Sequence, residues 1–152
     1  AAAGNGGADG IGDCNDEQPV YPASIQEDNV LTVASVNRYD ELTDYSNFGG
    51  VSVHVAAPGG DRFTGDLFAP AIAHCNGPCS SSNVPYVGMM GTSMATPVTA
   101  GLAAVVKSMR SNYSPKQVKN HILNTGIYKN ELEDYVSSSK VINVQNAIDA
   151  LR

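Results

Sequence analysis

Ser93 is the residue whose position in the chain best suits chemistry. It lies in the segment GTSMATP, residues 91–97, between a glycine turn and an apolar helical pattern. Backbone N–H groups in the first turn of a helix have no partner within the helix, and they face outward with the positive end of the helix dipole. They stabilise an oxyanion that forms beside them, so a serine here could be a nucleophile in acyl transfer. The plainer alternative is that Thr92 or Ser93 is only an N-cap.

The elements that would position Ser93 follow from the spacing of apolar residues. An apolar residue recurs every three or four positions from Ala95 to Met109, which predicts a closely packed helix. Residues 29–36 and 51–57 are rich in β-branched and apolar types, as are the buried strands of a parallel sheet. We also expect a surface loop at 5–18, an irregular stretch at 60–85, a short strand at 86–89, a helix from a capping box at Ser114 to Gly126, a short apolar turn at 141–144 and a last helix from Asn143 to Leu151.

The composition sets limits on the class of protein. The 152 residues fit one compact domain, and 42% hydrophobic residues suffice for a core. The net charge of −6 has the wrong sign for neutralising a phosphate backbone, so no nucleic-acid partner is expected. No apolar run reaches the 18 or so residues that a membrane-spanning helix needs, so no membrane partner is expected either.

Several segments resemble the subtilisin-like serine proteases, the subtilase family, in the same order along the chain. GTSMATP, followed by Ala100-Gly101, is similar to the family's nucleophile segment. AAGN at 2–5 resembles the strand end that supplies its oxyanion-hole asparagine, and YPAS at 21–24 resembles the turn beside its primary specificity pocket. Residues 46–49 and 57–59 resemble turns around a later strand, and residues 141–144 with Ala147 resemble the entry to the C-terminal helix.

The resemblance implies a role for each matching residue. Ser93 would attack the scissile carbonyl of a protein or peptide substrate, while the Asn5 amide and the Ser93 backbone N–H would hold the oxyanion. Substrate contacts would lie at Ala2, Ala3, Gly4, Val20 and Thr92. A branched Val20 at the base of the pocket would favour small or medium apolar side chains, and the Tyr21-Pro22 bond would be cis. An Asn-Gly pair is also a turn signal in its own right.

To act as a nucleophile, a serine hydroxyl needs a base that takes up its proton, and a third group must hold that base in place. The family carries its aspartate in Asp-[Ser/Thr]-Gly and its histidine in His-Gly-[Ser/Thr]-x-Val, both before the asparagine, and neither string occurs here. We therefore expect the missing N-terminal half of the same catalytic domain to supply both, and this segment alone to be inactive. His54 is expected to be a hydrogen-bonded histidine in a strand, and His74 and His121 to be solvated.

Two other functions remain open from the sequence. GTSMA differs by one residue from the Gly-x-Ser-x-Gly elbow of α/β-hydrolase-like esterases, although only His121 follows the serine. The chain could also be a subtilase-like binding or structural module without a catalytic triad. The sequence before Ala1 would distinguish this module from an enzyme.

The cysteines predict a disulfide. Cys75 and Cys79 enclose a three-residue turn that could bring them together, whereas two cysteines with His74 or His121 give no recognisable zinc spacing. Cys14 would be free or paired with a segment outside this chain. A disulfide implies an oxidising compartment, and we expect a secreted, extracellular protein.

The acidic residues Asp9, Asp13 and Asp16 crowd one loop and are weak candidates for structural calcium. A solvated acidic turn is the alternative, because the spacing fails the EF-hand pattern. No cofactor is required for the expected chemistry.

The fold that the resemblance implies is α/β, the C-terminal portion of a doubly wound, mostly parallel sheet with the Ser93 helix through its centre. Residues 1–152 would form the nucleophile and oxyanion-hole part of the catalytic domain. A half-sheet without its partner strands leaves an open edge, so the isolated segment is expected to dimerise, swap domains or aggregate.

Overall fold

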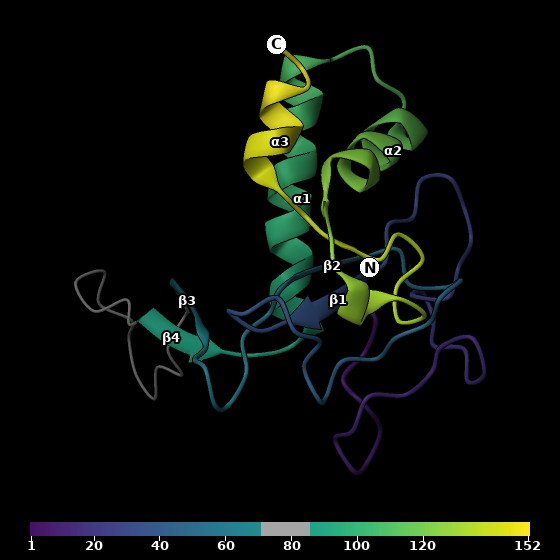
Figure 1. The fold of residues 1–152 in the computed structure, drawn as a ribbon, viewed down its shortest axis with the longest axis vertical. Coiled ribbons are helices and arrows are strands. Elements are labelled where there is room, and N and C mark those ends of the chain that lie inside the picture. Colours follow the sequence, from purple (N-terminus) through teal and green to yellow (C-terminus); the bar gives the residue numbers. More distant parts are fainter. Residues whose placement is uncertain (71–85) are drawn as a thin grey trace, which may run out of the picture.

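A computed structural model describes residues 1–70 and 86–152, and its centre is a mostly parallel sheet (Figure 1). The strand order is β1 (Val33–Val36), β2 (Val55–Pro58), β6 (Lys140–Val141) and β5 (Ile127–Tyr128). The β1–β2 and β2–β6 pairs are parallel, and the β5–β6 pair is antiparallel. Ala2 adds a parallel bridge to Val33, so the N-terminal residues extend the sheet beside β1. The predicted mixed α/β class with a mostly parallel sheet is confirmed.

The two central strands are buried on both faces, as their apolar runs predict. Every residue of β1 is buried, and so are the first three residues of β2. Both strands are shorter than predicted, because the ladder between them extends only from Val33–Val55 to Val36–Pro58. Before these strands, Val53 is buried and Leu31 packs against the core without joining that ladder, whereas Val51 is 67% exposed.

The three helices of the described residues pack on one face of the sheet. They are α1 (Thr92–Met109), α2 (Pro115–Thr125) and α3 (Val144–Asp149). Val33 and Val55 form a buried cluster with residues of all three helices, such as Leu102 and Ile122. Figure 1 shows these helices rising together from one side of the strands.

The opposite face of the sheet packs against a different part of the chain. Ala34 and Ala56, whose side chains alternate with those of the helical face, cluster with Leu132 and Val136 near the 3-10 helix η1 (Asn130–Leu132). Within residues 1–70 and 86–152, α-helices are therefore seen on one face only, and not on both faces as in a doubly wound sheet.

The helix starts show which local signals were correct. Ser114 forms the predicted capping box with Gln117, and the Asn143 side chain caps α3 by accepting from the Asn146 N–H at 2.7 Å. Helix α1 begins at Thr92, three residues before the first apolar residue of the pattern, and its N-cap residue is Gly91.

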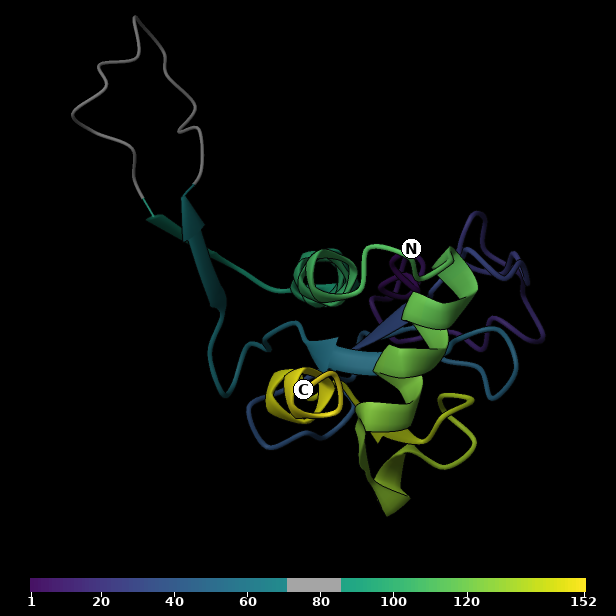
Figure 2. The same ribbon diagram turned by 90° about the horizontal axis from the view of Figure 1, so that it is seen from above.

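Two predicted irregular regions contain strands instead. β3 (Leu67–Pro70) lies within the stretch predicted to be irregular and pairs antiparallel with the predicted strand β4 (Tyr86–Met89). Figure 2 shows this hairpin projecting from the rest of the chain. The predicted turn at 141–144 is also partly wrong, because Val141 belongs to β6 and pairs with Ala56. No helix in the described part of the chain is long and apolar enough to cross a membrane.

Candidate active site

Ser93 is the second residue of α1, and its side chain is exposed. Met94 and Ala95 both donate their backbone N–H groups to the carbonyl of Gly91, which closes the first turn. Among the described residues, neither the hydroxyl nor the backbone N–H of Ser93 has a hydrogen-bond partner. Both groups are therefore available at the positive end of an 18-residue helix.

The Asn5 carboxamide lies against the residue directly before Ser93. Its Oδ1 accepts from the Thr92 backbone N–H at 2.9 Å and from the Thr92 hydroxyl at 2.8 Å. Asn5 thus caps α1 from 87 positions away, and the alternative that Thr92 or Ser93 is the N-cap is wrong. The Thr92 hydroxyl also accepts from the Gly4 N–H at 3.2 Å, which joins the two segments a second time.

The turn before the helix requires glycine. Gly91 has a φ of 146°, and a Cβ placed there would come within 3.3 Å of Asn5 Nδ2. Its backbone N–H donates to the carbonyl of Gly59, at the end of β2. A Cβ on Gly59 would in turn meet Ser35 Oγ at 2.1 Å, so only glycine allows this approach of the helix start to the sheet.

This arrangement leaves two donors facing outward at one helix mouth. Thr92 occupies Asn5 Oδ1, so the amide is oriented and its Nδ2 has no hydrogen-bond partner among the described residues. The backbone N–H of Ser93 is the second unpaired donor. Donors fixed in place before any charge develops can stabilise an anionic oxygen without reorganising, which is the chemistry of an oxyanion hole.

The other predicted substrate contacts differ in how accessible they are. Ala3 and Thr92 are fully buried, and the Ala3 N–H and carbonyl already bond Val33 and Asn15. Ala2 and Gly4 are half-buried at the sheet edge. Val20 is 39% exposed, and its backbone bonds Ser24 within its own turn. The Tyr21-Pro22 bond in that turn is cis, as predicted.

An apolar cavity that the sequence did not indicate begins one residue beyond Ser93. Its volume is about 380 Å³, and it lies between the β3–β4 hairpin and the first turns of α1. Its walls include Leu67, Phe68, Val87, Met94, Pro97 and Val98. The hairpin builds one wall, and because β3 was predicted to be irregular, no pattern pointed to this cavity.

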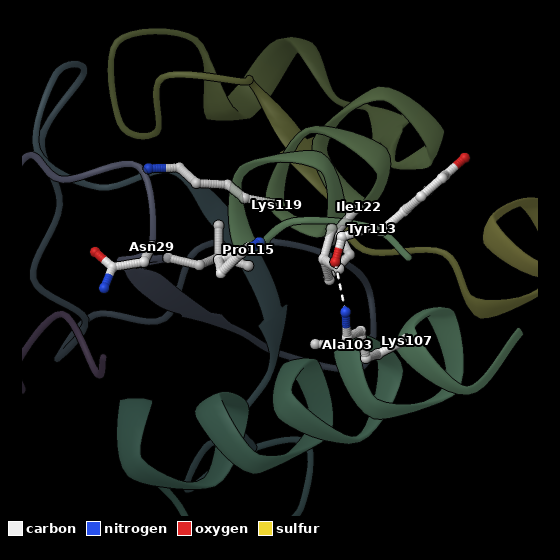
Figure 3. A pocket seen from close by; sticks show the side chains of 9 residues that line it. Asn29, Ala103, Lys107, Tyr113, Pro115, Lys119 and Ile122 are labelled. Atoms are coloured by element: carbon white, nitrogen blue, oxygen red, sulfur yellow. Dashed lines mark hydrogen bonds between the residues drawn. The ribbon is translucent and has the colours of Figure 1, made fainter. Parts of the chain in front are cut away.

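A second apolar cavity, of about 360 Å³, lies far from Ser93 (Figure 3). It separates α1 from α2 near Ile122, and Lys107 lies at one end with its Nζ bonded to the Tyr113 carbonyl at 2.6 Å. Ala103, the lining residue of α1 nearest to Ser93 in sequence, is ten positions after it. At 1.5 Å per residue this is about 15 Å along the helix, so this cavity belongs to helix packing rather than to the candidate site.

His54 is buried and hydrogen-bonded, as predicted, but it lies directly before β2 and not within a strand. Its Nδ1 accepts from the Thr32 backbone N–H at 3.0 Å, so the neutral ring carries its proton on Nε2. Nε2 lies 2.9 Å from Lys119 Nζ, and burial first, then the Lys119 charge, lowers the pKa of His54 to about 4. Burial also lowers the pKa of Lys119. Both ring nitrogens are occupied, so His54 is unsuited to serve as a base.

The other histidines do not supply a base within the described residues. His121 was expected to be solvated, but it is half-buried and its Nε2 lies 2.8 Å from the Ala147 carbonyl. His74 lies outside the described residues, as do Cys75 and Cys79 of the predicted disulfide. Cys14 is half-buried and in no disulfide in residues 1–70 and 86–152.

The three acidic candidates for calcium do not converge. Asp16 accepts from the backbone N–H groups of Val51 and Ser52 at 3.0 and 2.8 Å, and Asp9 accepts from Ile11 in its own turn. Burial alone would raise the pKa of Asp16, but these two backbone bonds lower it. The described residues contain no group of three or more carboxylate, cysteine or histidine side chains that could hold a metal.

Comparison with known families gives a match over nearly the whole chain. The family model described as Peptidase_S8, the subtilase family, matches residues 1–146. The chain is 35% identical to Subtilisin-like protease 2 of Plasmodium falciparum over 74% of its length. It is 31% identical to halolysin of Haloferax mediterranei and 32% identical to the thermostable alkaline protease of Halalkalibacterium halodurans, in both cases over 84% of its length. It spans 7%, 20% and 28% of these three relatives.

Solved structures show the same fold. A chain from a study of the assembly of subtilase cytotoxin SubAB superposes with a TM-score of 0.77 over 99% of this chain and 48% of its own, at 21% identity. A protease chain from Pseudoalteromonas arctica gives a TM-score of 0.71 over 87% of this chain and 38% of its own, at 26% identity. The fold therefore corresponds to about half or less of each of these chains.

Proposed function

Because this chain belongs to the subtilase family, we propose that it is the part of a serine endopeptidase that carries the nucleophile, Ser93, and an oxyanion donor, Asn5. The observation that carries this proposal is the pairing of Asn5 Oδ1 with both donors of Thr92, directly before the exposed Ser93. Within residues 1–70 and 86–152, this pairing leaves Asn5 Nδ2 and the Ser93 N–H without hydrogen-bond partners at the helix mouth.

In the proposed reaction, Ser93 Oγ attacks the carbonyl carbon of a peptide bond, and the hydroxyl proton passes to a base. The carbonyl oxygen becomes an anion that Asn5 and the Ser93 N–H hold. Collapse of this intermediate expels the amine, which takes up a proton, and leaves an ester on Ser93 that water then hydrolyses. Peptides and proteins are the proposed substrates.

The base and the carboxylate that orients it would come from a segment of the whole protein outside these 152 residues. Both ring nitrogens of His54 and Nε2 of His121 have partners in the structure, which supports this division. Family membership also overturns the α/β-hydrolase-like esterase alternative. Secretion, and helices on the second face of the complete sheet, are part of the same proposal.

The test is active-site labelling of the full-length protein that contains this chain. A peptidyl phosphonate should label Ser93, and Ser93→Ala should abolish both labelling and peptide hydrolysis. Ser108→Ala is the matched control, because Ser108 is an exposed serine on the same helix whose hydroxyl donates to the Val105 carbonyl. A folded full-length protein that neither reacts nor cleaves peptides would refute the endopeptidase and favour a non-catalytic module.

A further inference from the structure

Two buried asparagines hold the backbone on both sides of Asn5. The Asn47 side chain is 2% exposed, and its Oδ1 accepts from the Gly6 N–H at 2.7 Å and from the Asp13 N–H at 3.1 Å. The Asn47 backbone N–H donates to the Gly4 carbonyl at 2.9 Å. Asn47 therefore bonds the residue before Asn5 and the residue after it.

Asn15 completes the connection. Its side chain is 1% exposed, its Oδ1 accepts from Asn47 Nδ2 at 2.9 Å, and its Nδ2 donates to the Ala3 carbonyl at 2.8 Å. The two amides form a chain in which each bond has a fixed direction, because the backbone N–H groups can only donate and the Ala3 carbonyl can only accept. Neither side chain can rotate its amide without losing a buried hydrogen bond.

The backbone around Asn5 also has little space. Gly4 and Gly6 have φ values of 118° and 68°, and a Cβ on Gly4 would lie 2.6 Å from Asn47 Nδ2. The Asn5 side chain itself is exposed. An exposed amide is thus carried on a loop that is packed and hydrogen-bonded from beneath.

We propose that Asn47, acting with Asn15, is a positioning residue that holds Asn5 at the mouth of α1. This inference rests on the proposed function. Thr92 fixes the Asn5 side chain, and Asn47 fixes the backbone from which that side chain extends, so both are needed to place Nδ2. Small displacements of an oxyanion donor reduce turnover more than substrate binding, because the donor acts on charge that develops in the transition state.

The test measures peptide hydrolysis by Asn47→Ala in the full-length protein. The expected result is a loss of about tenfold in kcat with KM changed less than about twofold, a fraction of the loss when an oxyanion donor is removed outright. In an Asn5→Ala background, the same substitution should lower kcat by less than about twofold, since the effects of two residues that act through one group are not additive. Asn47→Ser, which keeps a small polar group, replaces Asn47→Ala if the latter does not fold.

Asn37→Ala is the matched control. Asn37 is 8% exposed, its Oδ1 accepts two backbone N–H groups, from Tyr39 and Glu41, and its Nδ2 donates to the Glu41 side chain. This control should lose a similar amount of thermal stability and keep its kcat. The inference is overturned if Asn47→Ala or Asn47→Ser keeps the wild-type kcat, or if the loss is equally large without Asn5. Wild-type protein that cleaves no peptide would instead refute the proposed function itself.

Discussion

Acidification should destabilise the protein through His54 well before its carboxylates are protonated. His54 is 6% exposed, and its pKa falls from 6.5 to about 4 in the folded chain. Between these values the unfolded chain binds a proton that the folded chain does not, so falling pH favours unfolding. This loss of stability is absent above the unfolded pKa and complete below about pH 4.

The magnitude follows from the two pKa values. At pH 5 the difference in proton binding costs about 2 kcal/mol of unfolding free energy, and at pH 4 it costs about 3 kcal/mol, since one pKa unit corresponds to about 1.36 kcal/mol. The pKa values of Asp16 and Asp61 are lowered in the folded chain, so these groups act below their ordinary value of 3.8. Between pH 6.5 and pH 4, the effect of His54 on stability is therefore separated from the effects of Asp16 and Asp61.

The assay compares wild type with His54→Asn in urea unfolding at several pH values. Asparagine does not titrate, and its Oδ1 can take over the acceptor role of Nδ1 toward the Thr32 N–H. Both proteins are full-length, and circular dichroism follows their unfolding. The stability of wild type should fall relative to the variant by about 2 kcal/mol between pH 7 and pH 5. Parallel pH dependences would show that His54 is not held neutral, and the reasoning would fail.

Three further predictions concern the helix starts. Thr92→Val keeps the shape of a buried side chain but removes the hydrogen bond from its hydroxyl to Asn5. Because one hydrogen bond contributes about 1 to 1.5 kcal/mol, the variant should lower kcat on a peptide substrate about tenfold in the full-length protein, and an unchanged kcat would contradict the role of Thr92. Gly91→Ala forces a side chain to adopt a φ of 146° and should cost about 1 to 3 kcal/mol of stability in urea unfolding, whereas equal midpoints would remove the argument for strain. Asn143→Ala removes the cap of α3 and should cost about 1 kcal/mol in thermal unfolding, while Asn143→Ser should restore most of it; no loss in the alanine variant would show that the cap contributes nothing.

The sequence alone predicted the elements whose signals are local. The apolar spacing of α1, the capping box at Ser114 and the Asn143 cap each depend on a few neighbouring residues, and all appear in the structure. The buried runs around β1 and β2 predicted a mostly parallel sheet, because strands covered on both faces lose the alternation of half-exposed strands. The segment around Ser93 was specific enough to indicate the subtilase family, to which the chain belongs.

Tertiary structure decided what depends on contacts between distant segments. β6 has only two residues, which is too few to show a period, and β3 forms through its pairing with β4. No periodic pattern in the sequence therefore indicated β6 or β3. The cap of α1 comes from Asn5, because the fold brings the sheet edge to the helix start, and no helix-local rule could assign it. The Asn15–Asn47 pair and the His54–Lys119 pair are likewise set by packing. Sequence fixes what a residue can donate or accept, but only the folded chain determines which partner it meets.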